Sequence, residues 1–433
     1  MADLADLSDS PIDSPTDTPT SPPAGAPTDT AGAGAQPELV DFPLRRTCPF
    51  APPPEYQRFR QEGPVVRIEL PSGQQPWLVT RHQEVRALLA DPRFSSNRFN
   101  PGFPAVFGSS RPQPGRFKPS LIAMDYPEHN PARRRVVGEF TVRRIEAMRP
   151  RIQQIVDERI DAMLAGPTPA DLVAALSLPV PSLVICELLG VPYSDHEYFQ
   201  ARSATVLNRT LPQETKRAAI DELQDYLDAL VTEKEHQPTD DLIGRQIRAR
   251  REAGDYRHDD VVALTVLLLI AGHETTANMI SLGTVVLLEN PDQLAIIAAD
   301  PSRTPAAVEE LLRYFTIAEV ATSRVALTDV ELGGVTIKAG DGVLVLSNSA
   351  NHDESVFTDP DTLDLLRGAR NHVAFGFGPH QCLGQNLARL ELRTVFDTLF
   401  RRVPGLRLAA PVEELKFKDN AAIYGLHELP VIW

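Results

Sequence analysis

The sequence predicts a mainly α-helical protein with small β-sheets. Three observations lead to this fold class. Helical patterns dominate from about residue 120 to residue 316, short strand-like segments lie on either side of this part, and an apolar run over residues 261–272 is closed by charged residues at both ends. Helix breaks are expected at Gly166-Pro167, Gly190-Pro192, His236-Pro238 and Asn290-Pro291.

The elements follow from these patterns in chain order. Two strands are expected over residues 65–70 and 77–80, and a helix over residues 83–90. Residues 92–119 lack periodicity, and a loop of this length is usually functional or mobile. Strand-like segments return later in the chain, over residues 324–332, 335–338, 343–346, 406–408 and 429–433.

The N-terminal segment differs in composition from the rest of the chain. Residues 1–38 are almost entirely Pro, Thr, Ser, Asp, Ala and Gly, which cannot bury enough apolar surface to offset the entropy of ordering. We expect a disordered tail there. Residues 39–433 contain no linker and are expected to form a single domain.

Composition restricts the location and the partners of the protein. The formal net charge of −15 gives no reason to expect nucleic-acid binding. No secretory signal is visible, and the longest apolar run is about half the length of a membrane span. Three cysteines indicate a reducing compartment, with Cys48 and Cys186 expected as packing residues. We expect a cytoplasmic protein without a membrane segment, and a monomer.

The residues from Phe375 to Gly384 place Cys382 in a glycine-rich loop directly before a helical pattern over residues 383–400. A thiolate is the metal-binding form of cysteine, and a helix N-terminus stabilises it through unpaired N–H groups. The three loop glycines permit unusual dihedral angles and the close approach of a bulky flat ligand. This context favours a ligand role, although most free cysteines are core residues.

The loop resembles the haem-thiolate loop of cytochrome P450 enzymes, Phe-Gly-x-Gly-x-x-x-Cys-x-Gly, at every fixed position. The resemblance covers residues 42–433 and is strongest to soluble actinobacterial members. It implies the P450 fold, with haem b buried between an oxygen-activating helix and the cysteine loop with its following helix. Cys382 would be the axial iron ligand. The resemblance implies that the following loop residues bind the cofactor: Phe375, Gly376, His380, Cys382 and Gly384.

A polar pair interrupts the apolar helix at Glu274 and Thr275. A charge in such a helix is costly unless it has a partner or a role, and the threonine hydroxyl can bond the Ala271 carbonyl four residues back. His273-Glu274 could begin a zinc-protease HExxH motif, but Ala277 stands where the second histidine should be. The pair could also be ordinary polar-face residues.

The same segment resembles the oxygen-activating helix of P450 enzymes, Ala/Gly-Gly-x-Asp/Glu-Thr. By this resemblance Glu274 and Thr275 would be catalytic, organising water and relaying protons during oxygen activation. Ala271 and Gly272 would leave room over the haem.

Glu310 and Arg313 lie three residues apart and so share a helix face. Such pairs are common on surface helices, where they are worth only a few tenths of a kcal/mol. This one resembles the ExxR motif of P450 enzymes, which locks the proximal core through buried hydrogen bonds. A third member is expected within residues 351–367.

Haem propionates need cationic or hydrogen-bonding partners, and arginine suits carboxylates best. Residues 125–135 resemble the family segment Asp-x-Pro-Glu-His-x-x-x-Arg, which implies that His129 and Arg133 face the propionates. Pro131 replaces the usual basic residue between them. Each position alone could be a solvated surface charge. Two further positions match propionate partners of the family: Arg324 and His380.

The resemblance implies a monooxygenase that inserts one oxygen atom from O2 into a hydrophobic small molecule, by hydroxylation or epoxidation. No flavin or iron–sulfur module is fused, so electrons would come from ferredoxin and ferredoxin reductase. Arginines over residues 133–144, with Arg389 and Arg393, could form a basic proximal patch for an acidic ferredoxin, or simply a solvated face.

Two other functions remain open at this point. One is a peroxide-using haem-thiolate enzyme, although such enzymes typically lack the acid–alcohol pair kept here. The other is a non-catalytic haem sensor or carrier. The substrate pocket is expected to be lined mostly by small or apolar side chains, which suggests a hydrophobic substrate such as a secondary metabolite, a terpenoid, a macrolide or a steroid-like compound. Its candidate lining residues are Ala271, Val320, Ala321 and Ile423, with arginines at 93, 98, 111 and 116 facing a carboxylate or water.

Overall fold

The computed structural model describes residues 37–42, 44–106, 120–318, 321–419 and 421–433. The described chain from Pro37 to Trp433 forms one compact unit. Of the tail expected over residues 1–38, only Pro37 and Glu38 are described, and Glu38 already belongs to a strand. The prediction for residues 1–36 lies outside the described residues.

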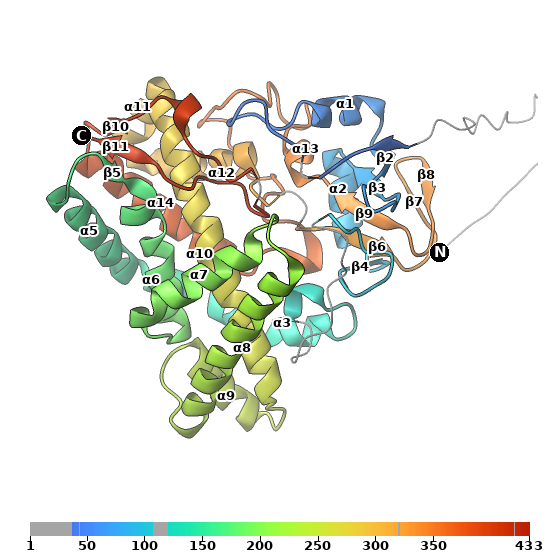
Figure 1. Ribbon diagram of the computed structural model, residues 1–433, viewed down its shortest axis with the longest axis horizontal. Helices are drawn as coiled ribbons and strands as arrows, with labels where there is room; N and C mark the ends of the chain where they lie inside the picture. The colour runs from blue at the N-terminus through green and yellow to red at the C-terminus, as the bar shows by residue number, and fades with distance from the viewer. Residues whose placement is uncertain (1–36, 43, 107–119, 319–320, 420) are drawn as a thin grey trace, which may run out of the picture. The chain divides into compact units, whose positions relative to one another are not determined.

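Helices make up most of the described chain, as predicted (Figure 1). The expected breaks coincide with helix ends, and Gly190 ends one helix in the left-handed conformation that favours glycine. The α-helices are α1 (Glu55–Glu62), α2 (His82–Ala90), α3 (His129–Val137), α4 (Val142–Ala147), α5 (Arg149–Ala165), α6 (Pro179–Leu189), α7 (His196–Leu207), α8 (Gln213–His236), α9 (Leu242–Glu252), α10 (His258–Glu289), α11 (Pro291–Ala299), α12 (Thr304–Phe315), α13 (Ser347–Asn351) and α14 (Gln385–Arg402).

The strands form three small sheets, with the orders β1-β2-β3-β9-β6-β4, β10-β11-β5 and β7-β8. In the largest sheet β3 pairs antiparallel with β2 and parallel with β9, which joins chain segments far apart in sequence. The strands are β1 (Glu38–Leu39), β2 (Val65–Glu69), β3 (Trp77–Val79), β4 (Phe94–Ser95), β5 (Ala170–Asp171), β6 (Arg324–Ala326), β7 (Val330–Leu332), β8 (Val335–Ile337), β9 (Gly342–Val345), β10 (Arg407–Leu408) and β11 (Pro430–Ile432).

One strand prediction was wrong in its extent. Residues 324–332 were expected to form a continuous strand, but they contain β6 and β7, which belong to different sheets. β6 pairs with β4 and β9, whereas β7 turns back on β8 through Gly333 and Gly334, both at positive φ. The chain therefore leaves the large sheet after Ala326.

α10 is the central helix of the fold and packs against α6, α8, α12 and α14 (yellow in Figure 1). A Cβ atom on Gly272 would lie 2.8 Å from Ile185 of α6, and one on Gly283 would lie 2.5 Å from Phe396 of α14. Both glycines therefore bring neighbouring helices close to α10. By length and composition α10 could cross a membrane, but most of its apolar stretch is buried inside the fold.

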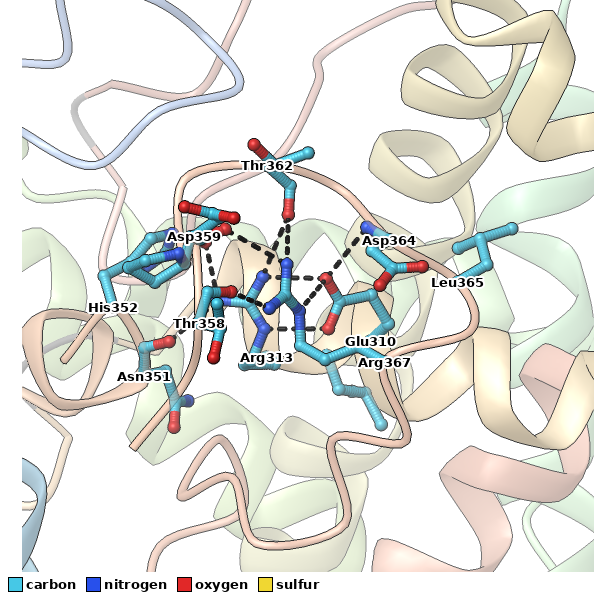
Figure 2. Close-up of polar contacts among 12 residues, drawn as sticks. Glu310, Arg313, Asn351, His352, Thr358, Asp359, Thr362, Asp364, Leu365 and Arg367 are labelled. Carbon is cyan, nitrogen blue, oxygen red and sulfur yellow. Dashed lines mark hydrogen bonds and ion pairs between the residues drawn. The ribbon is translucent and has the colours of Figure 1, made fainter. Parts of the chain in front are cut away.

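The Glu310–Arg313 pair on α12 is fully buried. Arg313 donates to both carboxylate oxygens, at 2.8 and 2.7 Å, so the pair is bidentate (Figure 2). Its remaining nitrogen donates to the carbonyl oxygens of Asn351 and Pro360, both at 2.8 Å. A buried pair of this kind is stable only when the other donors and lone pairs are also satisfied, which is the case here.

The third member of this network is Arg367, inside the stretch where the sequence placed it without naming a residue. Its Nε atom donates to Glu310 at 3.1 Å. Its terminal nitrogens donate to the carbonyl oxygens of Thr358, Asp359 and Thr362 (Figure 2). Arg367 thus connects α12 to the irregular segment that leads to the cysteine loop.

Replacing Arg367 with methionine should lower the free energy of unfolding by about 1–3 kcal/mol, because Glu310 loses a charged donor in a buried setting. Urea unfolding of the haem-loaded protein measures this. The matched control is Arg370→Met, since Arg370 is exposed three residues away and its side chain forms no hydrogen bond or ion pair within the described part of the chain. Equal unfolding midpoints for the two variants would contradict the role given to Arg367.

Candidate functional site

The loop that precedes α14 holds Cys382 in a fixed backbone position. The Cys382 N–H donates to the carbonyl oxygen of Phe375 at 2.8 Å, which closes the loop on itself. Gly376 and Gly378 adopt φ values of 69° and 71°, in the region that favours glycine. Gly384 differs from the expectation, because its φ of −83° is open to any residue and a Cβ atom there would meet nothing within 4 Å.

The electrostatic surroundings of Cys382 have two opposing parts. Burial raises the pKa of the Cys382 thiol, whereas the backbone N–H groups of Gly384 and Gln385 and the cations Arg133 and Arg389 lower it. The two N–H groups belong to the N-terminus of α14, so the predicted contribution of that helix is present. A coordinating metal removes the thiol proton outright, and these donors would then bond the thiolate.

The other two cysteines lack such an environment. Cys186 is buried on α6, as predicted, and burial raises its pKa to about 12. Cys48 is exposed, so its prediction as a packing residue was wrong. The Pro-rich segment around it contributes Phe50 to the core instead.

A polar cluster of Glu309, His372 and Arg389 contacts the cysteine loop. Arg389 lies 4.6 Å from the ring centre of Phe375 and forms two hydrogen bonds to Glu309, at 2.6 and 2.8 Å. His372 lies 3.2 Å from the same carboxylate. Burial would raise the pKa of Glu309, but Arg389 and His372 outweigh it and lower that pKa to about 2. Arg389 is therefore turned into the protein, and its predicted place in a surface patch was wrong.

Four predicted cofactor-binding side chains converge on the side of the loop where α3 lies. The rings of His129 and His380 lie 3.9 Å apart, and Arg133 donates to the Gln381 carbonyl oxygen at 2.6 Å. Pro131 fits this geometry because it is the third residue of α3, where the backbone N–H has no acceptor within the helix. The positive charge of Arg324 lowers the pKa of both His129 and His380.

These side chains form no ion pair among the described residues. The charge of Asp125 raises the pKa of His129 and Arg324, but the Asp125 carboxylate accepts its hydrogen bonds from Ser95 and Ser96. Burial, together with His129 and the two arginines, lowers the pKa of His380 to about 3. Burial and Arg98 lower the pKa of Arg324 to about 10, and the Arg324 hydrogen bonds go to the carbonyl oxygens of Thr322 and Ser323. The His129 Nε2 atom is buried without a hydrogen-bond partner. A haem that brings two propionates fits this set of donors.

In the polar pair of α10, Thr275 forms the predicted hydrogen bond, whereas Glu274 has a partner that the sequence did not predict. The Thr275 hydroxyl donates to the Ala271 carbonyl oxygen at 2.9 Å, as expected. Glu274 forms an ion pair with Lys418, with 2.5 Å between Oε1 and Nζ. Sequence reasoning missed Lys418, because it lies 144 residues from Glu274 in a segment without a motif.

The pocket candidates are only partly described. Ala271 and Ala321 are exposed, Ile423 is buried, and Val320 lies outside the described residues. Of the four loop arginines, Arg93 is exposed and pairs with Asp91, while the pKa of Arg98 is lowered by burial. Positions 111 and 116 lie outside the described residues.

Comparisons with known proteins all lead to one family. The family model described as Cytochrome P450 matches residues 52–298 and 303–404. The vitamin D3 dihydroxylase of Streptomyces griseolus is 47% identical over 94% of this chain and 100% of its own length. The crystal structure of cytochrome P450 MoxA from Nonomuraea recticatena is 57% identical, has a TM-score of 0.84 and covers 91% of this chain and 98% of its own.

A third relative was solved with a ligand. The mycinamicin VIII C21 methyl hydroxylase MycCI from Micromonospora griseorubida, bound to mycinamicin VIII, is 42% identical, with a TM-score of 0.84. It covers 92% of this chain and 100% of its own.

Replacing Cys382 with alanine should abolish the absorption band that reduced haem-thiolate proteins show with carbon monoxide, because it removes the sulfur ligand. A carbon monoxide difference spectrum measures this. Cys48→Ala is the control, since Cys48 is exposed and lies in the Pro-rich segment before α1. Loss of the band in the control, or its persistence in Cys382→Ala, would contradict the assignment.

Proposed function

The chain belongs to the cytochrome P450 family of haem-thiolate monooxygenases, and on this premise we propose that it inserts one oxygen atom from O2 into a hydrophobic small molecule, with Cys382 as the axial ligand of the iron. The observation that carries the proposal is the convergence of the cysteine loop with four cationic or imidazole side chains that form no ion pair with a carboxylate among the described residues. The haem supplies the oxidising chemistry when bound.

The residues around the haem would each perform one task. His129, Arg133, Arg324 and His380 would hold the two propionates and thereby fix the orientation of the ring. Phe375, Gly376 and Gly384 would form the loop surface beside it.

The acid–alcohol pair would deliver protons on the opposite side. The Thr275 hydroxyl is anchored to the Ala271 carbonyl and would hold a water or pass a proton at its oxygen. Burial would raise the pKa of Glu274, but the neighbouring groups, Lys418 foremost, together outweigh burial and keep that pKa below its ordinary range, so the carboxylate is ionised and able to accept a proton. This pair favours O2 over peroxide as the oxidant.

Electrons would come from a ferredoxin and its reductase. Arg134, Arg135, Arg143 and Arg144 are exposed on α3 and α4, and α3 is bonded to the cysteine loop through Arg133. Val142 is 62% exposed on the same segment, so apolar and basic groups occur together there. An acidic partner docked on this segment would lie close to the sulfur ligand.

The substrate would be a hydrophobic secondary metabolite, such as a terpenoid, macrolide or steroid-like compound. Support comes from the small or apolar residues Ala271, Ala321 and Ile423, and from relatives named for vitamin D3 and mycinamicin VIII. A compound library screened for the substrate-induced change in haem spin state tests this proposal. If only small charged compounds changed the spin state, the proposed class would be wrong. We also expect a cytoplasmic monomer.

Two rival functions are separated by turnover measurements. A peroxide-using enzyme would turn over a screened ligand faster with hydrogen peroxide than with reduced ferredoxin. A sensor or carrier would form no product with either. Product formation that requires reduced ferredoxin and O2 would support the proposal against both.

Replacing Thr275 with alanine should divert most reducing equivalents into hydrogen peroxide, because the relay loses the hydroxyl beside Glu274. The ratio of peroxide formed to NADH consumed measures this, and we expect it to rise several-fold. Thr265→Ala is the matched control, since the Thr265 hydroxyl makes the same bond four residues back, to Val261 at 2.8 Å, earlier in α10. A ratio in Thr275→Ala no higher than in the control would count against the relay.

Reversing charge at Arg143 and Arg144 should slow ferredoxin association about tenfold at low ionic strength, and the difference should vanish at high salt. Stopped-flow reduction of the haem protein by reduced ferredoxin measures this. Arg58→Glu on α1 is the control, because Arg58 is also exposed and paired with carboxylates. α1 and α3 lie apart in Figure 1. Equal rates for all variants would exclude the patch.

A further inference from the structure

Lys418 forms an ion pair with Glu274, the acid of the proposed proton relay. Its Nζ atom lies 2.5 Å from Glu274 Oε1 and 3.0 Å from Asn278 Oδ1. Glu274 and Asn278 lie four residues apart on one face of α10, so the ammonium group bridges two successive turns of the helix. The Glu274 and Lys418 side chains are only 12% and 14% exposed.

The backbone around Lys418 is fixed by a hairpin between Phe417 and Leu426. These two residues form a bridge, and the Lys418 N–H donates to the Gly425 carbonyl oxygen at 2.8 Å. A Cβ atom on Gly425 would lie 2.1 Å from Asn278 Oδ1. Only glycine therefore lets the hairpin approach α10 closely enough for Lys418 to reach Glu274 in this arrangement.

The same hairpin is bonded to the end of α7. The Ala422 N–H donates to the Leu207 carbonyl oxygen at 3.1 Å, and Asn208 forms a bridge with Ala421. Glu274 is thus connected through Lys418 to a segment outside its own helix.

Among the described residues, Lys418 and His273 are the ionisable groups that act on Glu274. Lys418 favours the ionised form of Glu274, the nearby Asn278 amide also does, His273 would do so only when protonated, and burial acts against them. His273 lies on α10 itself, is fully buried and contacts Phe199 of α7. Burial lowers the pKa of His273, so this ring is neutral near pH 7, and Lys418 is left as the permanent cation beside the carboxylate.

We propose that Lys418 is a positioning residue of the proton relay: it holds the Glu274 carboxylate ionised and in place, and thereby sets how readily Glu274 takes up a proton from solvent. This inference rests on the proposed role of Glu274. In each transfer the carboxylate binds one proton from solvent and releases it toward Thr275, and Lys418 stays protonated throughout.

Infrared titration of the Glu274 carboxyl group between pH 4 and pH 9 tests the inference without turnover. The spectra of Glu274→Gln are subtracted so that only this group remains. In Lys418→Met, burial is no longer opposed by the cation, and the protonation midpoint should rise by about one pH unit or more. In Lys418→Arg it should stay within a few tenths of a unit. Unchanged midpoints in Lys418→Met would overturn the inference.

Coupling measurements give a second, independent result. Peroxide formed per NADH should rise several-fold in Lys418→Met and stay near wild type in Lys418→Arg, with a ligand from the spin-state screen present. In the Glu274→Gln background, Lys418→Met should add nothing. An equal added effect there would show that Lys418 acts only as a structural clamp and would overturn the inference.

Two further outcomes are distinguishable. If Lys418→Met loses haem, Lys418→Gln, which keeps a polar head, replaces it in both measurements. If Glu274→Gln leaves coupling unchanged, the proposed role of Glu274 fails, whereas the infrared midpoints still report whether Lys418 controls the carboxyl group.

Discussion

One buried carboxylate, Glu310, organises the part of the chain that carries the sulfur ligand. Between α13 and α14 the described chain has no α-helix or strand, so its carbonyl groups cannot be satisfied by ladder hydrogen bonds. Arg313 and Arg367 donate to four of these carbonyl groups and to that of Asn351, the last residue of α13, and Glu310 orients both guanidinium groups. A buried ion pair is seldom a large net stabiliser. Its contribution here is to fix one conformation for an irregular segment that ends at Cys382.

The other wall of the site is rigid for a different reason. Gly272 and Gly283 let α10 pack closely against α6 and α14, so the helix has little freedom to shift. Thr275 and Glu274 therefore stand on a scaffold that is fixed from two sides. Groups that must act within a fraction of an ångström benefit from such support. Different interactions thus fix the two sides of the site. Hydrogen bonds fix the cysteine loop, and apolar packing fixes α10.

Much of this could be predicted from local sequence, and the failures share one cause. The helix breaks, the Thr275–Ala271 bond and the helix N-terminus behind Cys382 depend on residues close together in the chain. Residues such as Arg367 and Lys418 act across 57 and 144 positions, where no local pattern identifies the partner. Two-residue strands such as β1 and β5 carry too few side chains to show alternation. The pairing of Arg389 with Glu309 and the exposure of Cys48 likewise depend on tertiary neighbours.

The hairpin between Phe417 and Leu426 has a consequence for adapting this protein to other substrates. Ile423, a candidate pocket residue, and Lys418 lie five positions apart on this one short element. Its backbone meets α10 through Gly425 with no spare space, so a larger side chain at position 423 cannot be accommodated by moving the hairpin outward without drawing Lys418 from Glu274. On the proposed roles of Ile423 and Lys418, changes at this hairpin that alter the substrate range would also alter the share of reducing equivalents lost to peroxide.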